Sequence, residues 1–247
     1  MFPLLKFTQN KVFLRYSWGG GCPPPHYGGD MNERTIFKRK IQQLSKKIAL
    51  DHDFTLYKRT FLIKEESNIV CMIVFDFPPT AMQFHVAVQP LYIPSERLHI
   101  TVGYNIQRPN FVQKGYWGSN PEHFDCDINE ITETIHNEVL PFFQTVSTPQ
   151  KLIDYLQNDS SKRIRVAPNI SKSHIAYSLL MTHQYDAALP YFNAVRNDLC
   201  QYTIDSANKQ LATIENIISM IENKEYYEIS DFLNQTITDV KTVCGLV

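Results

Sequence analysis

Residues 68–77 read NIVCMIVFDF, and apolar side chains fill both alternate sets of positions in this run. A short continuous apolar run of this kind is typical of a strand that is buried on both faces. Turn-forming residues bound it, with Glu66-Ser67-Asn68 on one side and Pro78-Pro79-Thr80 on the other. Residues 68–77 therefore predict the central strand of a β-sheet.

Three further segments have a strand-like composition, residues 54–65, 82–92 and 97–107. The connections between consecutive segments are only a few residues long, whereas a crossover between parallel strands needs about a dozen residues or more. Consecutive strands must therefore run antiparallel. Together the four segments predict a four-stranded antiparallel meander.

The last two predicted strands alternate between apolar and polar residues. Phe84, Val86 and Val88 share one face of the first strand. Pairing across the turn at Pro94-Ser95-Glu96 places odd-numbered residues opposite odd-numbered ones, because side chains alternate with a period of two. One face of this hairpin is therefore expected to be polar. Its residues are Gln83, His85, Gln89, His99, Thr101 and Asn105.

Amphipathic helical stripes occur on both sides of the meander in the sequence. The first has a face rich in Lys and Gln opposite its apolar side. The second follows Asp127 and Glu130, which have the spacing of a capping box. The apolar residues of the two stripes are Phe37, Ile41, Leu44 and Ile48, and Ile128, Ile131, Ile135 and Val139. The pattern predicts an α+β fold, a four-stranded antiparallel meander with helices packed on one face, followed by an all-helical C-terminal region.

Residues 31–157 resemble an uncharacterised bacterial family, the domain of unknown function numbered 4304. The resemblance rests on the N-terminal amphipathic helix, the tract FTLYKRTFLIKEESNIVCMIVFD at residues 54–76, a Trp in the following loop and a helix that ends in LPFF at residues 140–143. It implies a domain over residues 31–157 and a bacterial cytosolic origin. It implies no activity and no catalytic residue.

Residues 1–30 contain no sustained helical or strand period and become rich in Gly and Pro toward their end. Lys6 and Lys11 interrupt the apolar residues too early for a secretory signal. Gly28-Gly29-Asp30-Met31 is what GGA-GGT-GAT-ATG encodes, a ribosome-binding sequence followed by a start codon. We therefore expect residues 1–30 to be a non-native extension from a start codon assigned too early. A disordered N-terminal arm is the alternative.

The C-terminal third reads as helices that follow a linker. Residues 158–172 are polar and basic and predict the linker. Residues 173–247 carry successive apolar stripes, which predict a helical bundle or a hairpin repeat. Within them, AYSLLMTHQYDAALPYFNAV at 176–195 resembles one tetratricopeptide hairpin, although His183 replaces the glycine that is common in its turn. The matching packing positions are Ala176, Leu179, Tyr185, Ala188 and Phe192.

Composition bears on the partner and the compartment. The formal net charge of −1 gives no reason to expect nucleic acid or an anionic membrane as the main partner. No apolar stretch approaches the ~18 residues of a membrane span. The five cysteines are scattered without a CxxC motif, which predicts reduced thiols and a cytoplasmic protein.

Catalytic and metal sites have little support in the sequence. His99-Ile100-Thr101 matches the H-x-T motif of two-histidine phosphoesterases, but His85-Val86-Ala87 lacks the second hydroxyl. His123, Cys126 and Asp127 could approach a metal ion, but Asp127 is expected to cap a helix. P-loop, dinucleotide-binding and GxSxG motifs are absent. We therefore expect no catalytic residue, no metal ion and no cofactor.

These observations favour a non-enzymatic protein-binding module, of which a toxin-neutralising immunity protein is one form. One alternative is an enzyme, similar to hydrolases or phosphoesterases, that uses the polar face around His85 and His99. Another is a weak nucleic-acid binder that uses the basic residues 162–165. The sequence identifies no small-molecule ligand. The expected binding surface consists of polar and aromatic side chains, which are common interface anchors. Its residues are His85, Gln89, His99, Tyr116 and Trp117.

Overall fold

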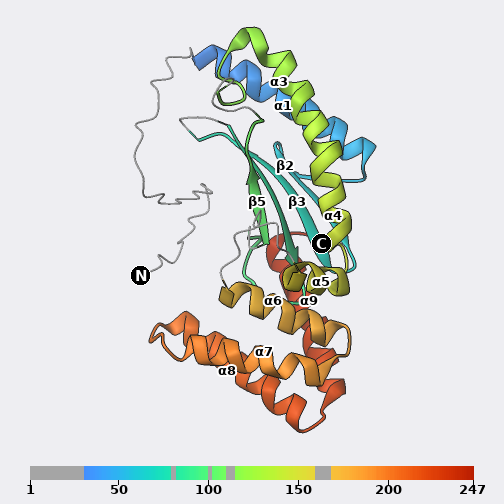
Figure 1. Ribbon diagram of the computed structural model, residues 1–247, viewed down its shortest axis with the longest axis vertical. Helices are drawn as coiled ribbons and strands as arrows, with labels where there is room; N and C mark the ends of the chain where they lie inside the picture. The colour runs from blue at the N-terminus through green and yellow to red at the C-terminus, as the bar shows by residue number, and fades with distance from the viewer. Residues whose placement is uncertain (1–30, 79–81, 100–101, 110–114, 159–167) are drawn as a thin grey trace.

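The computed structural model describes residues 31–78, 82–99, 102–109, 115–158 and 168–247. The predicted extension at residues 1–30 and the basic residues 162–165 lie outside these ranges. The sheet has five antiparallel strands in chain order and packs against helices, so the predicted α+β class is confirmed (Figure 1). The strands are β1 (Thr55–Lys58), β2 (Phe61–Glu66), β3 (Ile69–Asp76), β4 (Gln83–Pro90) and β5 (Val102–Ile106).

The sheet has five strands instead of the predicted four because residues 54–65 form a hairpin. β1 and β2 pair through Leu56 opposite Leu62 and Lys58 opposite Phe61, which leaves Arg59-Thr60 as the turn. Neither turn residue is Gly, Asn, Asp or Pro, the usual signals of a tight turn. The sequence therefore contains no recognisable turn signal at the point where the chain reverses. β3 is the central strand, as predicted.

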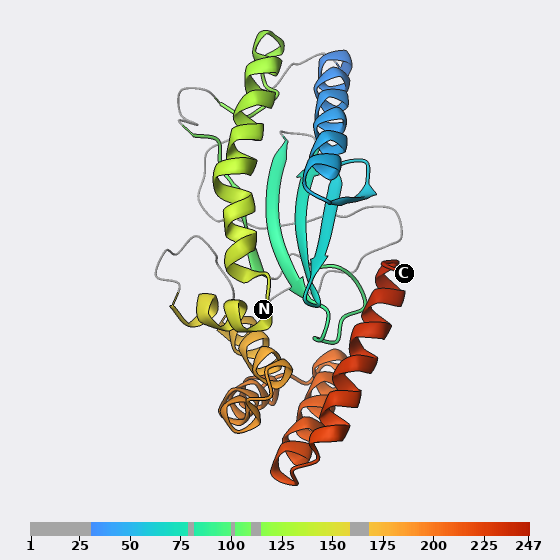
Figure 2. The same ribbon diagram turned by 90° about the vertical axis from the view of Figure 1, so that its right-hand side faces the viewer.

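Helices cover one face of the sheet, as the sequence predicts (Figure 2). α1 (Met31–Asp51) lies beside α3 (Phe124–Thr134), which follows a short 3-10 turn (Pro121–His123). α3 continues through a π-helical turn (Ile135–Val139) into α4 (Leu140–Val146). The predicted apolar stripes are buried with the exception of the half-buried Ile128. The buried members are Phe37, Ile41, Leu44, Ile48, Ile131, Ile135 and Val139.

The β4–β5 pairing follows the predicted register, with His85 opposite Asn105. β5 is shorter than predicted, because the described part of the strand begins at Val102 and residues 97–99 belong to a loop. Gly103 lies opposite Ala87, and a Cβ on Gly103 would come within 2.7 Å of the Ala87 Cβ. Glycine at this position allows the two backbones to approach closely.

The C-terminal region is helical, as predicted, and no helix of the described residues combines the length and apolar character needed to cross a bilayer. α6 begins at Pro168, so residues 168–172 of the predicted linker are helical; residues 159–167 are not described. The helices are α5 (Pro149–Asn158), α6 (Pro168–Met181), α7 (Tyr185–Leu199), α8 (Asp205–Glu222) and α9 (Tyr226–Cys244).

The α6–α7 and α8–α9 hairpins have the same turn. Gln184 and Glu225 each donate their backbone N–H to the carbonyl five residues earlier, at 2.9 Å in both turns. His183 and Lys224 both adopt a left-handed conformation, with φ of 59° and 60°. This conformation favours glycine, so both positions hold a backbone geometry that residues with a side chain rarely adopt.

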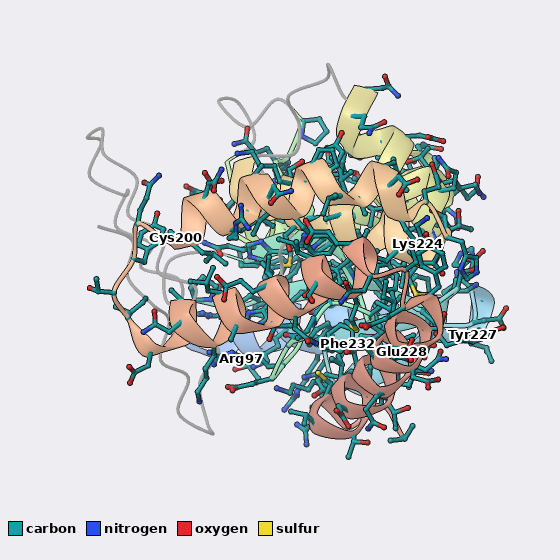
Figure 3. All side chains as sticks on the ribbon, turned by 90° about the horizontal axis from the view of Figure 1, so that it is seen from below. Arg97, Cys200, Lys224, Tyr227, Glu228 and Phe232 are labelled. Atoms are coloured by element: carbon teal, nitrogen blue, oxygen red, sulfur yellow. The ribbon has the colours of Figure 1, made fainter. Side chains whose placement is uncertain are left out.

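The two turns lie at the same end of the helical region. Tyr185 and Tyr226, the first residues of α7 and α9, stack with their ring centroids 4.3 Å apart and their planes 10° apart. Lys224 marks this end, and Cys200, just after α7, lies at the opposite end (Figure 3). The two hairpins are therefore aligned side by side at their turns.

Direct contacts join the sheet to the helical region. The fully buried Tyr92, in the loop after β4, shares a hydrogen bond of 2.8 Å with Ser178 of α6. On the edge strand β1, the Tyr57 hydroxyl donates to the Cys244 carbonyl of α9 at 2.8 Å. Side chains from both regions belong to one hydrophobic cluster. The helices therefore pack on the sheet through apolar and polar contacts together.

Candidate functional site

The exposed side of α1 forms one wall of a cleft. Arg39, Gln42, Gln43 and Lys46 recur at intervals of three and four residues, so they share one side of the helix. The opposite side of α1 is buried in the core, which fixes the rotation of the helix. This polar stripe is therefore held in place beside the sheet.

The β1–β2 hairpin forms the other wall. Leu56, Lys58 and Arg59 face the α1 stripe across a cleft of about 610 Å³. Lys58 and Arg59 reach this wall because the chain reverses at Arg59-Thr60. Leu56 is 36% exposed and supplies an apolar surface among the charges. The cleft therefore combines cations and amides around one exposed aliphatic side chain.

The cleft is positively charged. Among the described residues, its lining includes the cations Arg39, Lys46, Lys58 and Arg59 and no carboxylate. None of these four forms an ion pair with an acidic side chain of the described ranges, whereas other basic residues do. Because the whole chain has a formal net charge of −1, the local excess of positive charge does not follow from composition. The cleft is suited to an anionic ligand.

β1 is the edge strand beside this cleft. Within the described residues it pairs with β2 on one side and has no strand on the other. Both Leu56 and Lys58 belong to this strand. The open edge of such a strand can pair with an extended peptide from another chain.

The predicted site residues His85 and Gln89 lie in β4 and are buried. The Gln89 Nε2 donates to the Arg97 carbonyl at 3.2 Å, and its Oε1 accepts the backbone N–H of His99. Gln89 therefore fastens the loop after β4 to the strand. The His85 Nε2 lies 3.1 Å from the Gln83 Oε1. The polar side chains of this face thus bond to each other and to the backbone of their own hairpin.

His99 is half-buried in the loop after β4. Burial lowers the pKa of both His85 and His99, and the positive charge of Arg97 adds to the lowering at His99. Both imidazoles are therefore biased toward the neutral form. Thr101, the hydroxyl of the H-x-T motif, lies outside the described residues.

The remaining predicted residues, Tyr116 and Trp117, are neighbours with different environments. Tyr116 is 38% exposed, whereas Trp117 is 4% exposed and packs near Phe84 with ring centroids 6.0 Å apart. The Trp117 Nε1 donates to the Glu130 Oε2 at 3.1 Å. The structure therefore does not bring the five predicted residues together on an exposed surface. Only His99 and Tyr116 of that set are accessible to solvent to a substantial degree.

A buried ionic network surrounds Asp127, which the sequence predicted to be a helix cap. α3 begins earlier, at Phe124, so Asp127 lies within its first turn. Its carboxylate accepts the Gly118 N–H at 2.6 Å and pairs with Arg108 at 2.5 Å. Arg108 also pairs with Glu130 at 2.8 Å. Asp127 therefore connects α3 to the loop before it, and burial raises the pKa of its carboxyl.

The described residues contain no candidate metal cluster, and the environment of the buried Cys71 disfavours a reactive thiolate. No group of three or more His, Cys, Asp or Glu side chains in these ranges could hold a metal ion. Asp127, a candidate ligand beside His123 and Cys126, is engaged by Arg108. Burial raises the pKa of the Cys71 thiol to about 12, which disfavours a thiolate.

The sequence predicts one of the two walls of the basic cleft. The Lys- and Gln-rich face of α1 follows from helical periodicity alone. The second wall requires the Arg59-Thr60 turn, and neither residue of that turn is a usual turn former. The sequence therefore predicts a polar helix face without the hairpin that converts it into a cleft.

Comparison with known proteins gives no relative from which a role could be transferred. No protein-family model, curated protein or solved structure matches this chain. The resemblance of residues 31–157 to family 4304 stays a prediction. The geometry and charge of the cleft are therefore the basis for a proposed function.

Proposed function

We propose that the protein is a non-enzymatic protein-binding module and that its basic cleft binds an acidic segment of a partner protein. The observation that carries this proposal is a cleft with four cations, none of which has a carboxylate partner among the described residues. Acidic side chains of a partner would supply the missing counter-charges and increase the rate of association. Leu56 would contact an apolar residue of the same segment.

A peptide suits this cleft better than a nucleic acid does. Proteins that bind single-stranded nucleic acid combine positive charge with aromatic side chains on which bases stack. No aromatic residue of the described segments lines the cleft, whereas Gln42 and Gln43 offer amides that can bond to a peptide backbone. The open edge of β1 offers a further set of backbone donors and acceptors to an extended segment.

Binding of defined anionic probes tests the proposal. A fluorescein-labelled oligoglutamate peptide and a labelled single-stranded oligonucleotide of equal charge are titrated by fluorescence anisotropy. We expect the peptide to bind more tightly and to weaken with added salt. The charge reversals Arg39→Glu and Lys58→Glu together should weaken peptide binding by at least about tenfold, or ~1.4 kcal/mol.

Lys47→Glu is the matched control, because Lys47 is exposed on α1 and does not line the cleft. It changes the net charge without changing the cleft, so it should alter the affinity by less than about twofold. Equal losses in Lys47→Glu and Arg39→Glu would mean that only overall charge matters and would contradict the proposal. Tighter binding of the oligonucleotide would favour the nucleic-acid alternative.

A natural partner is sought with the C-terminally tagged protein in its native host. We expect a second protein to co-purify in equal amount with the wild-type chain and to be lost from Arg39→Glu/Lys58→Glu. A partner retained by the double variant would place the interface elsewhere. An absence of partners together with no peptide binding would remove the protein-binding interpretation.

A further inference from the structure

The helical region contains a second concave site, separate from the basic cleft. It is a pocket of about 200 Å³ between α6, α7, α8 and the loop after β4. Its apolar wall includes side chains from α7, α8 and the loop after β4. They are Ile93, Pro94, Val195, Leu199 and Ile214. The volume is below the ~300–1,000 Å³ typical of drug-sized ligand sites, so the pocket suits a molecule with a single ring.

Tyr177 of α6 is one of the residues that line this pocket. The residue is 4% exposed, and its ring is held edge-on against Phe192 with centroids 5.2 Å apart. Within the described residues its hydroxyl has no hydrogen-bond partner. The comparable Tyr92 hydroxyl does have one, at Ser178. A hydroxyl without a partner in the described residues can donate a hydrogen bond to an acceptor placed in the pocket.

His174, one turn before Tyr177, also lines the pocket and is neutral. Burial lowers its pKa to about 4. Its Nδ1 lies 2.8 Å from the Ile170 carbonyl, which can only accept a hydrogen bond. The proton of the neutral ring is therefore on Nδ1, and Nε2 is an acceptor. The imidazole adds a polar surface to the pocket without adding charge.

The pocket has no unbalanced charge in its described lining. Asp198 is the one ionisable carboxylate among the lining residues, and it forms an ion pair with Lys172 at 3.0 Å. A charged ligand would lose its hydration shell here without gaining an unpaired counter-ion. The lining therefore favours an uncharged ligand.

We propose that this pocket binds a small uncharged aromatic molecule whose oxygen accepts a hydrogen bond from the Tyr177 hydroxyl. The apolar wall provides the contact area, and Tyr177 fixes the orientation of the ring. The proposal is independent of the basic cleft, because the two sites share no residue.

Three probes of similar size test the assignment: acetophenone, ethylbenzene and benzoate. Each is titrated into the full chain while methyl signals are followed by 1H–13C NMR. We expect acetophenone to shift the methyl signals of Ile170, Val195, Leu199 and Ile214 and to saturate. Ethylbenzene, which lacks the acceptor, should bind more weakly, and benzoate, which is charged, more weakly still.

Tyr177→Phe is the decisive variant, because it removes the hydroxyl and keeps the ring. Its acetophenone affinity should fall about fivefold, the effect expected of one neutral hydrogen bond. Its ethylbenzene affinity should stay within twofold of wild type, which also reports an intact pocket. Equal acetophenone binding by wild type and Tyr177→Phe would overturn the hydrogen-bond assignment. An absence of saturable shifts at the four methyl-bearing residues would overturn the site.

Discussion

The α+β region and the helical region bury polar groups in different ways. In the α+β region, Arg108, Asp127 and Glu130 form an ionic network that is almost fully buried. In the described helical region, the buried polar residues carry no charge, since burial keeps His174 neutral. These residues are His174, Ser178 and Thr236. The sheet side is thus held together in part by buried charge, and the helical side by apolar packing and neutral hydrogen bonds.

The candidate sites of the two regions also differ in charge. The cleft beside α1 is open and carries four cations, whereas the pocket among α6, α7 and α8 is small and mostly apolar. Each region therefore offers a site that matches its own chemistry. The two should respond to different perturbations, charge removal in one and protonation or hydroxyl removal in the other.

The largest effect is expected for Arg108→Met, which removes the cation that pairs with the buried Asp127 and the partly buried Glu130. Loss of one partner from a buried ion pair typically costs about 3–5 kcal/mol. We expect a decrease of this size in the free energy of unfolding, measured by urea denaturation. Lys40→Met, which removes an ion pair to the exposed Asp125, should cost about 0–1 kcal/mol.

Equal stability of Arg108→Met and Lys40→Met would remove the evidence that buried charge stabilises the α+β region. It would mean that the buried network contributes no more than a surface pair. Methionine is a suitable replacement because it fills a similar volume without introducing a new charge.

Acidification should destabilise the helical region through His174. His174 has its pKa lowered from 6.5 to about 4, so the unfolded chain takes up a proton near pH 6.5 and the native chain does not. The free energy of unfolding should therefore fall as the pH falls through this window, by at most ~1.4 kcal/mol per pH unit. His85 and His99 are shifted in the same direction.

Urea denaturation between pH 7.5 and pH 5 measures this dependence. His174→Gln should have a smaller slope than wild type, whatever its stability at pH 7.5. His123→Gln, at an exposed residue, should keep the wild-type slope. An unchanged slope in His174→Gln would assign the acid sensitivity to other groups.

The smallest effect is the expected difference in stability between the Phe variants of two buried tyrosines, Tyr92 and Tyr177. Tyr92→Phe removes the hydrogen bond to Ser178 and should lower the free energy of unfolding by ~1 kcal/mol. Tyr177→Phe removes a hydroxyl that has no partner among the described residues, so stability should stay the same or rise. Thermal denaturation of both variants measures the difference. A loss in Tyr177→Phe as large as that in Tyr92→Phe would mean that its hydroxyl is satisfied in the free protein.

Periodicity in the sequence was sufficient to predict most elements and their buried faces. The α1 stripe through Phe37 and Ile48, the central strand at residues 68–77 and the β4–β5 register all agree with the structure. Each is a local property, because side-chain direction repeats every 3.6 residues in a helix and every two in a strand. Alternation also predicted a polar face on β4. It did not predict that His85 and Gln89 would be buried there.

Only the tertiary structure decided which polar residues meet and which remain exposed. The sequence assigned Asp127 to a helix cap and Trp117 to a surface, whereas Arg108 and Glu130 draw both into the interior. It predicted the polar side of α1, but not the Arg59-Thr60 turn that completes the cleft. Periodicity shows which side of an element is apolar. It does not show which distant charges and hydroxyls the packed elements bring together, because that depends on the whole fold.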